Sequence, residues 1–525
     1  MTSGLLVEVT GGRVQGIASR GLRFWRGLPY AAPPVGDLRL RAPRPVVPWT
    51  GVRDASTFGP IVPQDRRSLT VASGAGDPQS EDGLTLNVIA PSTASDRLRP
   101  VMVYVHGGAY AVGSSREMPT QGEGLVHDGG VVFVNLNYRL GALGFLDFTR
   151  YSTPERPFES NLGLRDMVAA LEWVRDNIRG FGGDPDNVTL FGESAGANAV
   201  TTLMAVPSAA GLFARAIAES SPPEAVYPPE LTSVWARDYL ELLGAVTARP
   251  LGADPTPAEV AQLLDSATPQ QLVAATSRMV RETPDRVPGT IALCPVIDGD
   301  FLPERPVDAF ADGTAHRVPL IIGTNDREGS FFRGRIDILA STPSRIRAIL
   351  TRTPRAAAQR LARLYPGLSK PRAAADFAGD YTFWYPSVRV AEGHSRHAPT
   401  YAYRFDLAPR LARLIGLDAT HGIELFAIFD LVRTPYARAM GALGGIRAFD
   451  RTARRMRMNW LRFAHDGTVD AGWPTYDEER RRTLIIDADD RIEEDPNRER
   501  REAWAAFVPH LPETERAQPQ RVDAA

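Results

Sequence analysis

The residues Gly192-Glu193-Ser194-Ala195-Gly196 form a G-x-S-x-G motif, and its serine is a candidate nucleophile. An apolar run over residues 188–191 predicts a strand before the motif, and the pattern of residues 195–204 predicts a helix after it. A serine at such a junction sits on a sharp, strained turn, where a Cβ two residues to either side would collide with neighbouring backbone. The motif therefore predicts an exposed hydroxyl at the carboxyl end of a strand.

A serine hydroxyl becomes a good nucleophile only when an oriented imidazole accepts its proton. In this strand-turn-helix arrangement an acidic residue and then the histidine follow the serine along the chain. Among the histidines after Ser194, His421 is the best placed, because it follows a strand predicted over residues 400–405 and precedes an apolar stretch. The other histidines after the serine are His316, His394, His397, His465 and His510.

The acid of such a site should lie just past a strand between the serine and the histidine. The apolar residues 320–322 predict this strand, and both Asp326 and Glu328 follow it closely. Position in the sequence does not separate these two carboxylates.

Backbone donors for a developing oxyanion are the third requirement of this chemistry. His106-Gly107-Gly108-Ala109 directly follows a strand predicted over residues 101–105. Glycines there let main-chain N–H groups approach a substrate oxygen closely, and the N–H of Ala195 completes a predicted oxyanion hole. The four signals in this chain order indicate acyl transfer by a serine nucleophile.

The elements that must position these residues alternate between strands and helices. Residues 101–105 and 131–134 are compact apolar runs, which are typical of strands covered on both faces. Apolar residues recur at helical spacing between 163 and 180. The alternation predicts the α/β class, with a mostly parallel central sheet covered by helices. Further strands are predicted at residues 188–191, 317–322 and 400–405.

We expect one catalytic domain over residues 1–510, because neither an internal repeat nor a flexible linker interrupts the chain. Residues from about 225 to 285 and from about 335 to 395 are predicted to be helical insertions that roof the active site. The polar residues 511–525 are predicted to be a disordered tail.

The composition is that of a soluble globular protein, with 525 residues, 43% hydrophobic and 23% charged. The 60 Lys+Arg and 62 Asp+Glu leave a formal net charge of −2. This charge provides no basic excess for a phosphate backbone, so we expect no nucleic-acid partner. No apolar run approaches the length of about 18 residues that a membrane helix needs, so we expect no membrane partner.

The single cysteine, Cys294, excludes an intrachain disulfide, so the fold needs no oxidising compartment. Residues 1–14 lack the basic segment and long apolar stretch of a signal peptide. Both observations favour a cytoplasmic protein.

Longer motifs make the chain similar to the type-B carboxylesterases, the α/β-hydrolase family that includes bacterial para-nitrobenzyl esterases and the cholinesterases. The resemblance covers roughly residues 5 to 490 and implies a bacterial, para-nitrobenzyl esterase-like protein. It rests on the motifs FWRGLPYA (24–31), SEDGLTLNV (80–88), HGGAY (106–110), NYRLGALGF (137–145), FGGDP (181–185), FGESAG (191–196), DREG (326–329), HGIE (421–424) and WPTY (473–476).

Carried onto this sequence, the resemblance implies Ser194 as nucleophile and His421 as general base and acid. It implies Glu328 rather than Asp326 as the triad acid. The oxyanion donors it implies are Gly107, Gly108 and Ala195.

The resemblance also separates structural positions from variable ones. Arg39 and Glu81 match a structural ion pair, so neither is expected to be catalytic. Glu219-Ser220-Ser221 departs from the usual Gln-Ser-Gly near the acyl pocket, which affects the expected substrate range and not the reaction.

The implied activity is that of a serine carboxylesterase that hydrolyses uncharged, largely apolar carboxylic esters, aryl esters and carbamates included, through an acyl-enzyme. The implied partner is a small-molecule ester, with no metal or organic cofactor, and the protein is expected to be a monomer or homodimer. An amide or lactone substrate is an alternative, because the same triad serves. A non-catalytic adhesion protein is another, because some family members lack the serine, but this chain keeps every catalytic position.

Overall fold

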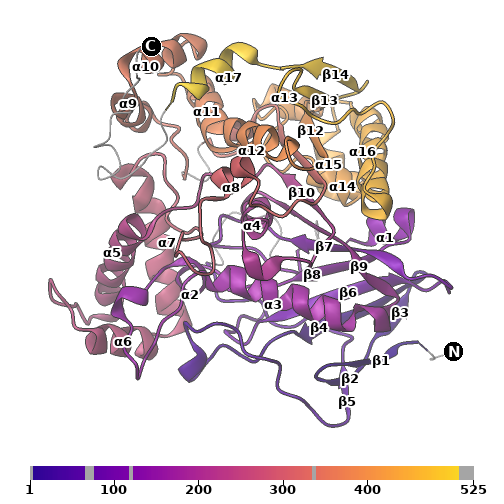
Figure 1. The fold of residues 1–525 in the computed structure, drawn as a ribbon, viewed down its shortest axis with the longest axis vertical. Coiled ribbons are helices and arrows are strands. Elements are labelled where there is room, and N and C mark those ends of the chain that lie inside the picture. The colour runs from indigo at the N-terminus through magenta and orange to yellow at the C-terminus, as the bar shows by residue number, and fades with distance from the viewer. Residues whose placement is uncertain (1–3, 66–75, 118–121, 334–337, 508–525) are drawn as a thin grey trace.

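The structure is a computed structural model that describes residues 4–65, 76–117, 122–333 and 338–507. In these ranges eleven strands form one sheet, in the order β14-β13-β12-β11-β10-β9-β7-β8-β6-β4-β3 (Figure 1). The strands from β13 to β8 in this order run parallel to one another. They are β7 (Arg99–Val105), β8 (Val132–Leu136), β9 (Gly183–Glu193), β10 (Arg215–Glu219), β11 (Leu320–Asn325), β12 (Thr400–Phe405) and β13 (Arg482–Ile486).

Antiparallel strands complete both edges of this sheet. They are β3 (Ile17–Ser19), β4 (Leu22–Pro29), β6 (Thr85–Pro91) and β14 (Arg491–Glu494). A separate small sheet holds β1 (Leu6–Val9), β2 (Gly12–Gln15) and β5 (Val52–Asp54). The predicted α/β class with a mostly parallel sheet is therefore confirmed.

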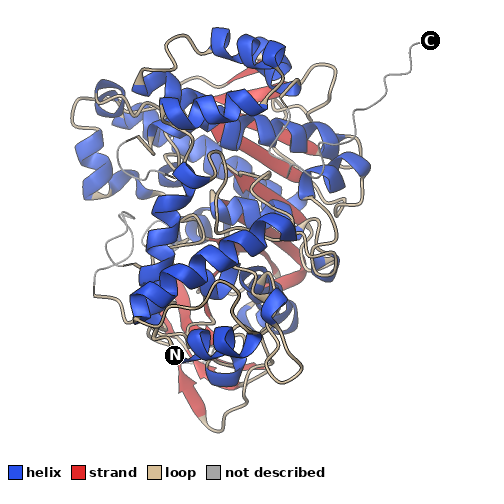
Figure 2. Cartoon of the chain, turned by 90° about the vertical axis from the view of Figure 1, so that its left-hand side faces the viewer, coloured by secondary structure: helices blue, strands red, loops and turns tan. Residues whose placement is uncertain are grey.

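The parallel strands are apolar throughout because both faces of the sheet are buried. On β7, Val103 and Val105 belong to one hydrophobic core, whereas Met102 and Tyr104 belong to the other. This alternation follows the two-residue period of a strand. Helices cover the strands on both sides, as Figure 2 shows.

One set of helices covers each face of the sheet. The first core is the one that holds Val103 and Val105, and the second is the one that holds Met102 and Tyr104. The first core includes residues of α2 (Ala142–Phe145), α3 (Leu162–Asn177), α4 (Ala195–Leu203), α5 (Pro229–Thr247), α6 (Pro257–Ser266), α7 (Pro269–Arg286), α8 (Pro306–Asp312) and α12 (Tyr385–Ser395). The second includes residues of α1 (Glu123–Gly129), α13 (Arg410–Leu414), α14 (Leu425–Ile428) and α16 (Ile446–Asp466), and Met440 of α15 (Pro435–Met440) packs against it.

A third, smaller core joins the C-terminal helix to helices between β11 and β12. It packs Trp504 of this C-terminal helix against Tyr365 and Phe377. The helices involved are α9 (Pro343–Arg352), α10 (Arg355–Leu364), α11 (Pro371–Gly379) and α17 (Arg498–Ala505), with a π-helix at Asp380–Trp384.

The ranges predicted as helical insertions contain α5, α6 and α7 in one case and α9 to α12 in the other. Helices α6 and α7 start at the capping boxes Thr256/Glu259 and Thr268/Gln271, which satisfy the N–H groups of the first turn. The single-domain organisation over residues 1–510 stays a prediction, and the tail at 511–525 lies outside the described residues. Within the described ranges no helix is both long and apolar enough to cross a membrane.

The parallel arrangement brings distant candidate residues to one edge of the sheet. Gly107 follows β7, Ser194 follows β9 and Glu328 follows β11, so all three lie beyond the carboxyl ends of parallel strands. His421 lies in the connection between β12 and α14. Loops at this edge of an open parallel sheet are where α/β proteins bind ligands.

Candidate active site

Ser194 occupies the strained turn that the G-x-S-x-G motif predicts. Its φ of 58° and ψ of −124° join β9 directly to α4. A Cβ at Gly196 would lie 2.1 Å from the carbonyl oxygen of Val105, and one at Gly192 would lie 2.6 Å from the carbonyl carbon of Gly196. Any side chain at these two positions would push the turn away from the sheet, so the glycines allow the strained serine to exist.

Glu328 and His421 meet in a buried hydrogen bond. The Nδ1 of His421 donates to Oε2 of Glu328 across 2.5 Å. His421 is 8% exposed and Glu328 is 3% exposed. Glu328 is the first residue of a short 3-10 helix, Glu328–Ser330, that follows β11. Asp326 points elsewhere, because its side chain is 44% exposed and lies 3.8 Å from Arg404.

The other imidazole nitrogen of His421 faces Glu193 of the motif. Nε2 lies 3.2 Å from Oε1 of Glu193. Among the described contacts, no hydrogen bond joins Nε2 to the hydroxyl of Ser194, although both residues line the same cavity. Catalytic hydrogen bonds are often long in ligand-free enzymes and tighten when substrate binds. The structure thus assembles the His421–Glu328 pair and places Ser194 in the same cavity.

The buried carboxylates around the imidazole set its protonation. Burial lowers the pKa of His421, but the charges of Glu193 and Glu328 outweigh it and raise the pKa to about 9. Burial raises the pKa of Glu193 to about 7 and that of Glu424 to about 8. The proton on His421 is therefore coupled to the charge of Glu193.

A second layer of polar residues holds Glu328 from behind. The hydroxyl of Ser220 lies 2.7 Å from Oε1 of Glu328 and 2.9 Å from Oε1 of Glu424. Asn325 donates its backbone N–H to Glu328 and its side-chain amide to Glu424, each across 2.6 Å. Because Ser220 has one proton, a protonated Glu424 would donate to Ser220 while Ser220 donates to Glu328.

Sequence reasoning misses this second layer. In the sequence, Glu424 stands out only as part of the HGIE motif, and Ser220 only as part of a departure near the acyl pocket. The structure places Ser220 and Ser221 outside the lining of the cavity, and Glu219 accepts a hydrogen bond from the indole of Trp460 across 2.6 Å. The departure at residues 219–221 therefore lies behind the site and not on its substrate-facing wall.

The glycines after β7 lie against the serine turn. A Cβ at Gly107 would be 3.1 Å from the Cβ of Ser194, and Gly108 has a φ of +110° that favours glycine. Among the described residues, neither glycine N–H has a hydrogen-bond acceptor. Both glycines and Ala195 line the cavity.

The cavity has a volume of 350 Å³ and is mainly apolar. Apart from tyrosines, the titratable side chains that line the cavity are Glu117, Glu193 and His421. Burial raises the pKa of Glu117 to about 8, so this carboxyl is largely neutral at pH 7. Its apolar lining includes Val280, Ile291, Leu293, Ile338, Leu339, Ala412, Leu425, Leu431, Ala437, Met440 and Phe449.

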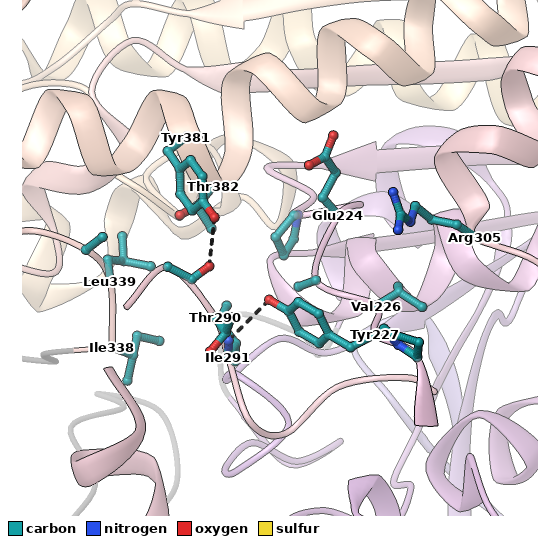
Figure 3. A pocket seen from close by; sticks show the side chains of 15 residues that line it. Glu224, Val226, Tyr227, Thr290, Ile291, Arg305, Ile338, Leu339, Tyr381 and Thr382 are labelled. Carbon is teal, nitrogen blue, oxygen red and sulfur yellow. Dashed lines mark hydrogen bonds between the residues drawn. The ribbon is translucent and has the colours of Figure 1, made fainter. Parts of the chain in front are cut away.

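A smaller cavity, shown in Figure 3, shares Ile291 and Leu339 with this one. Its volume is 50 Å³. Tyr227 accepts a hydrogen bond from the N–H of Ile291, and Tyr381 donates one to the carbonyl of Gly289. The chain from Gly289 to Ile291 is therefore held at both ends.

The aromatic run at 383–385 divides between the site and the core. Phe383 lines the cavity, and its ring lies 4.6 Å from the imidazole of His421. Trp384 and Tyr385 instead pack in the third core. The expected ion pair of Arg39 and Glu81 is present at 2.5 Å, away from the cavity lining.

Other histidines that follow Ser194 serve the fold. The Nε2 atoms of His316, His394 and His465 bond to backbone carbonyls, and His510 lies outside the described residues. Cys294 is a buried free thiol. In the described part of the chain, no group of three or more His, Cys, Asp or Glu could hold a metal ion.

Comparisons with known proteins define the class of protein to which this chain belongs. The family model described as "Carboxylesterase family" matches residues 3–504. The chain is 36% identical over 500 residues to the para-nitrobenzyl esterase of Bacillus subtilis (strain 168), covering 95% of this chain and 98% of that protein. It is 32% identical to the phenmedipham hydrolase of Pseudarthrobacter oxydans, covering 92% and 94%.

Solved structures agree with these relatives. A structure titled thermophylic PNB esterase has a TM-score of 0.85 and 35% identity, covering 95% of this chain and all of that one. The protein is therefore a carboxylic ester hydrolase with the α/β-hydrolase fold. It belongs to the carboxylesterase family, and para-nitrobenzyl esterases are among its relatives.

Proposed function

We propose that Ser194, His421 and Glu328 form the catalytic triad of this carboxylesterase. The observation that carries the proposal is the buried hydrogen bond between His421 and Glu328, in a cavity that also holds a serine on a strained turn. The carboxylate fixes the tautomer with hydrogen on Nδ1, which leaves Nε2 to accept the proton of the hydroxyl.

The reaction proceeds in two acyl-transfer steps. Ser194 attacks the ester carbonyl while His421 takes its proton, and the N–H groups of Gly107, Gly108 and Ala195 stabilise the oxyanion. The proton then passes to the leaving alcohol, and an acyl-enzyme remains. Water, activated by the same imidazole, attacks the acyl-enzyme and releases the acid and the free serine.

The cavity supports uncharged, largely apolar esters as substrates. Most of the lining side chains are apolar, and the carboxylate of Glu193 would repel an anionic substrate, whereas the carboxyl of Glu117 is largely neutral at pH 7. Aryl esters and carbamates belong to this class, and para-nitrobenzyl esterase and phenmedipham hydrolase are relatives of the chain.

Ser194→Ala and His421→Ala provide the direct test. Each should lower kcat for a short-chain p-nitrophenyl ester by about 10⁴-fold or more. A serine-directed phosphonate should label Ser194 and no other serine, as peptide mass spectrometry would detect. Ser221→Ala is the matched control, because Ser221 is buried near the site and, among the described residues, its hydroxyl bonds only to Thr201. Unchanged rates in both active-site variants would exclude the triad.

We also propose that the protein acts in the cytoplasm of a bacterium as a monomer or homodimer, with no nucleic-acid partner. The net charge of −2 and the single buried cysteine support this proposal. Cell fractionation and light scattering after gel filtration test it.

A further inference from the structure

We propose that His106 and Tyr138 are positioning residues that aim the N–H groups of Gly107 and Gly108 at the substrate oxyanion. This inference rests on the proposed function, because it takes those N–H groups as oxyanion donors. Neither side chain lines the cavity, so each acts through the backbone of the glycine loop.

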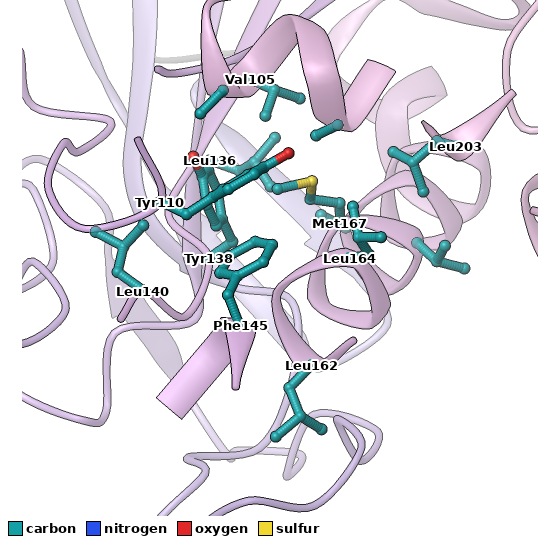
Figure 4. Packing of buried hydrophobic residues seen from close by; sticks show 14 of the residues in the cluster. Val105, Tyr110, Leu136, Tyr138, Leu140, Phe145, Leu162, Leu164, Met167 and Leu203 are labelled. Carbon is teal, nitrogen blue, oxygen red and sulfur yellow. The ribbon is translucent and has the colours of Figure 1, made fainter. Parts of the chain in front are cut away.

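The two rings form a buried stack behind the loop. Their centroids lie 4.4 Å apart with planes inclined by 19°, and the residues are 2% and 0% exposed. His106 directly follows β7 and Tyr138 follows β8, which are neighbouring parallel strands. The rings of Tyr110 and Phe145 pack against the phenol ring of Tyr138, as Figure 4 shows, so this ring is also held by neighbours other than the imidazole.

Each ring holds one carbonyl of the loop. The hydroxyl of Tyr138 donates to the carbonyl of His106 across 2.7 Å. The Nδ1 of His106 lies 2.9 Å from the carbonyl of Gly107. A carbonyl only accepts, so Nδ1 carries the hydrogen and donates it.

Fixing these carbonyls fixes the two N–H groups. In a trans peptide the C=O and the N–H of the next residue point in opposite directions. The carbonyl of His106 is therefore antiparallel to the N–H of Gly107, and the carbonyl of Gly107 is antiparallel to the N–H of Gly108. Both N–H groups have no acceptor among the described residues, and both glycines line the cavity.

The imidazole of His106 is suited to a fixed, uncharged role. Burial lowers its pKa to about 4, so the ring stays neutral at pH 7. Its Nε2 is buried without a hydrogen-bond partner among the described residues, which leaves Nδ1–H as the atom that makes the directed contact. A Cβ at Gly113 would lie 2.3 Å from Nδ1, so the chain also approaches the ring closely from this residue.

Tyr138→Phe tests the proposal because it keeps the stacked ring and removes only the hydroxyl. We expect kcat for p-nitrophenyl butyrate to fall by about 10- to 100-fold with KM changed by less than about threefold, since an oxyanion contact acts mainly in the transition state. The affinity for a trifluoromethyl ketone, which forms an anionic hemiketal with the serine, should fall by a similar factor.

Tyr30→Phe is the matched control. Tyr30 is buried, and its hydroxyl donates to the carbonyl of Asn137 across 2.6 Å, next to Tyr138 in the chain. The Tyr30→Phe variant loses the same kind of hydrogen bond as Tyr138→Phe, but outside the glycine loop. Its kcat and its affinity for the ketone should therefore stay within about threefold of the values for the unsubstituted protein. Equal effects of Tyr30→Phe and Tyr138→Phe, or a loss confined to KM, would overturn the proposal.

The imidazole is tested by rescue. His106→Phe removes the donor, whereas the amide of His106→Asn can donate from about the position of Nδ1. We expect the Asn variant to recover much of the kcat that the Phe variant loses; equal kcat values would contradict the role of His106. If these variants do not fold, Tyr138→Phe decides alone. Full activity of Ser194→Ala would instead refute the proposed function, so the two failures are distinguishable.

Discussion

Oε1 of Glu193 lies 3.2 Å from Nε2 of His421, the nitrogen that would receive the serine proton. The residue next to the proposed nucleophile in the sequence thus faces the proposed base. This carboxylate favours the protonated imidazole, which cannot accept a proton, so its charge bears directly on the pH range of activity.

Glu193→Gln should extend activity to lower pH. The Glu193 carboxylate contributes to raising the pKa of His421 to about 9, although burial opposes it. Activity requires neutral His421 and rises as pH passes through this pKa. Without the carboxylate the pKa falls, so the acid limb of kcat/KM against pH should move down by about one unit or more. Glu117→Gln, which changes another carboxyl of the cavity, should move it less. An unmoved limb in Glu193→Gln would contradict the coupling.

Glu328→Gln and Asp326→Asn should separate the two acids that position in the sequence alone leaves open. Loss of the carboxylate bonded to Nδ1 of His421 removes the partner that fixes the tautomer, so kcat should fall by about 10³- to 10⁴-fold. Asp326 is half exposed beside Arg404, and its substitution should change kcat by less than about threefold. Steady-state kinetics on one p-nitrophenyl ester suffices, and the reverse ranking would reassign the acid.

The location of the site follows from local sequence, but its side-chain partners do not. Ser194 could be placed because strand, turn and helix signals are contiguous, and glycine at 192 and 196 has a steric reason that the structure bears out. Asp326 and Glu328 follow the same strand, and only the short helix at Glu328–Ser330 turns one inward and leaves the other exposed. That choice depends on backbone geometry after the strand.

Contacts between distant segments were beyond the sequence signals. Ser220 follows β10 and Glu424 precedes α14, yet both belong to one hydrogen-bonded group behind Glu328. Their residue types are common in turns, and no spacing rule links positions 204 residues apart. Only the order of strands in the sheet brings them together.

Ser220→Ala should weaken the support of the triad acid. It leaves Glu328 and Glu424 without the hydroxyl between them, which should cost about 1–3 kcal/mol of stability and about tenfold in kcat. The neighbouring Ser221→Ala removes a buried hydroxyl that contacts Thr201 instead, so it should lower stability without a comparable loss of kcat. Thermal unfolding and kinetics of both variants give the comparison, and equal kcat values would dissociate Ser220 from the triad.

Gly196→Ala should disrupt the serine turn itself. The added Cβ would lie 2.1 Å from the carbonyl oxygen of Val105, which belongs to β7 and cannot move without distorting the sheet. The variant should lose about 1–3 kcal/mol of stability, and displacement of Ser194 by about 1 Å should lower kcat by about 10²-fold. Gly252→Ala is the matched control, because a Cβ there meets nothing within 4 Å. Wild-type kcat in a folded Gly196→Ala protein would show that the turn tolerates the methyl group, and the steric explanation of the motif would be wrong.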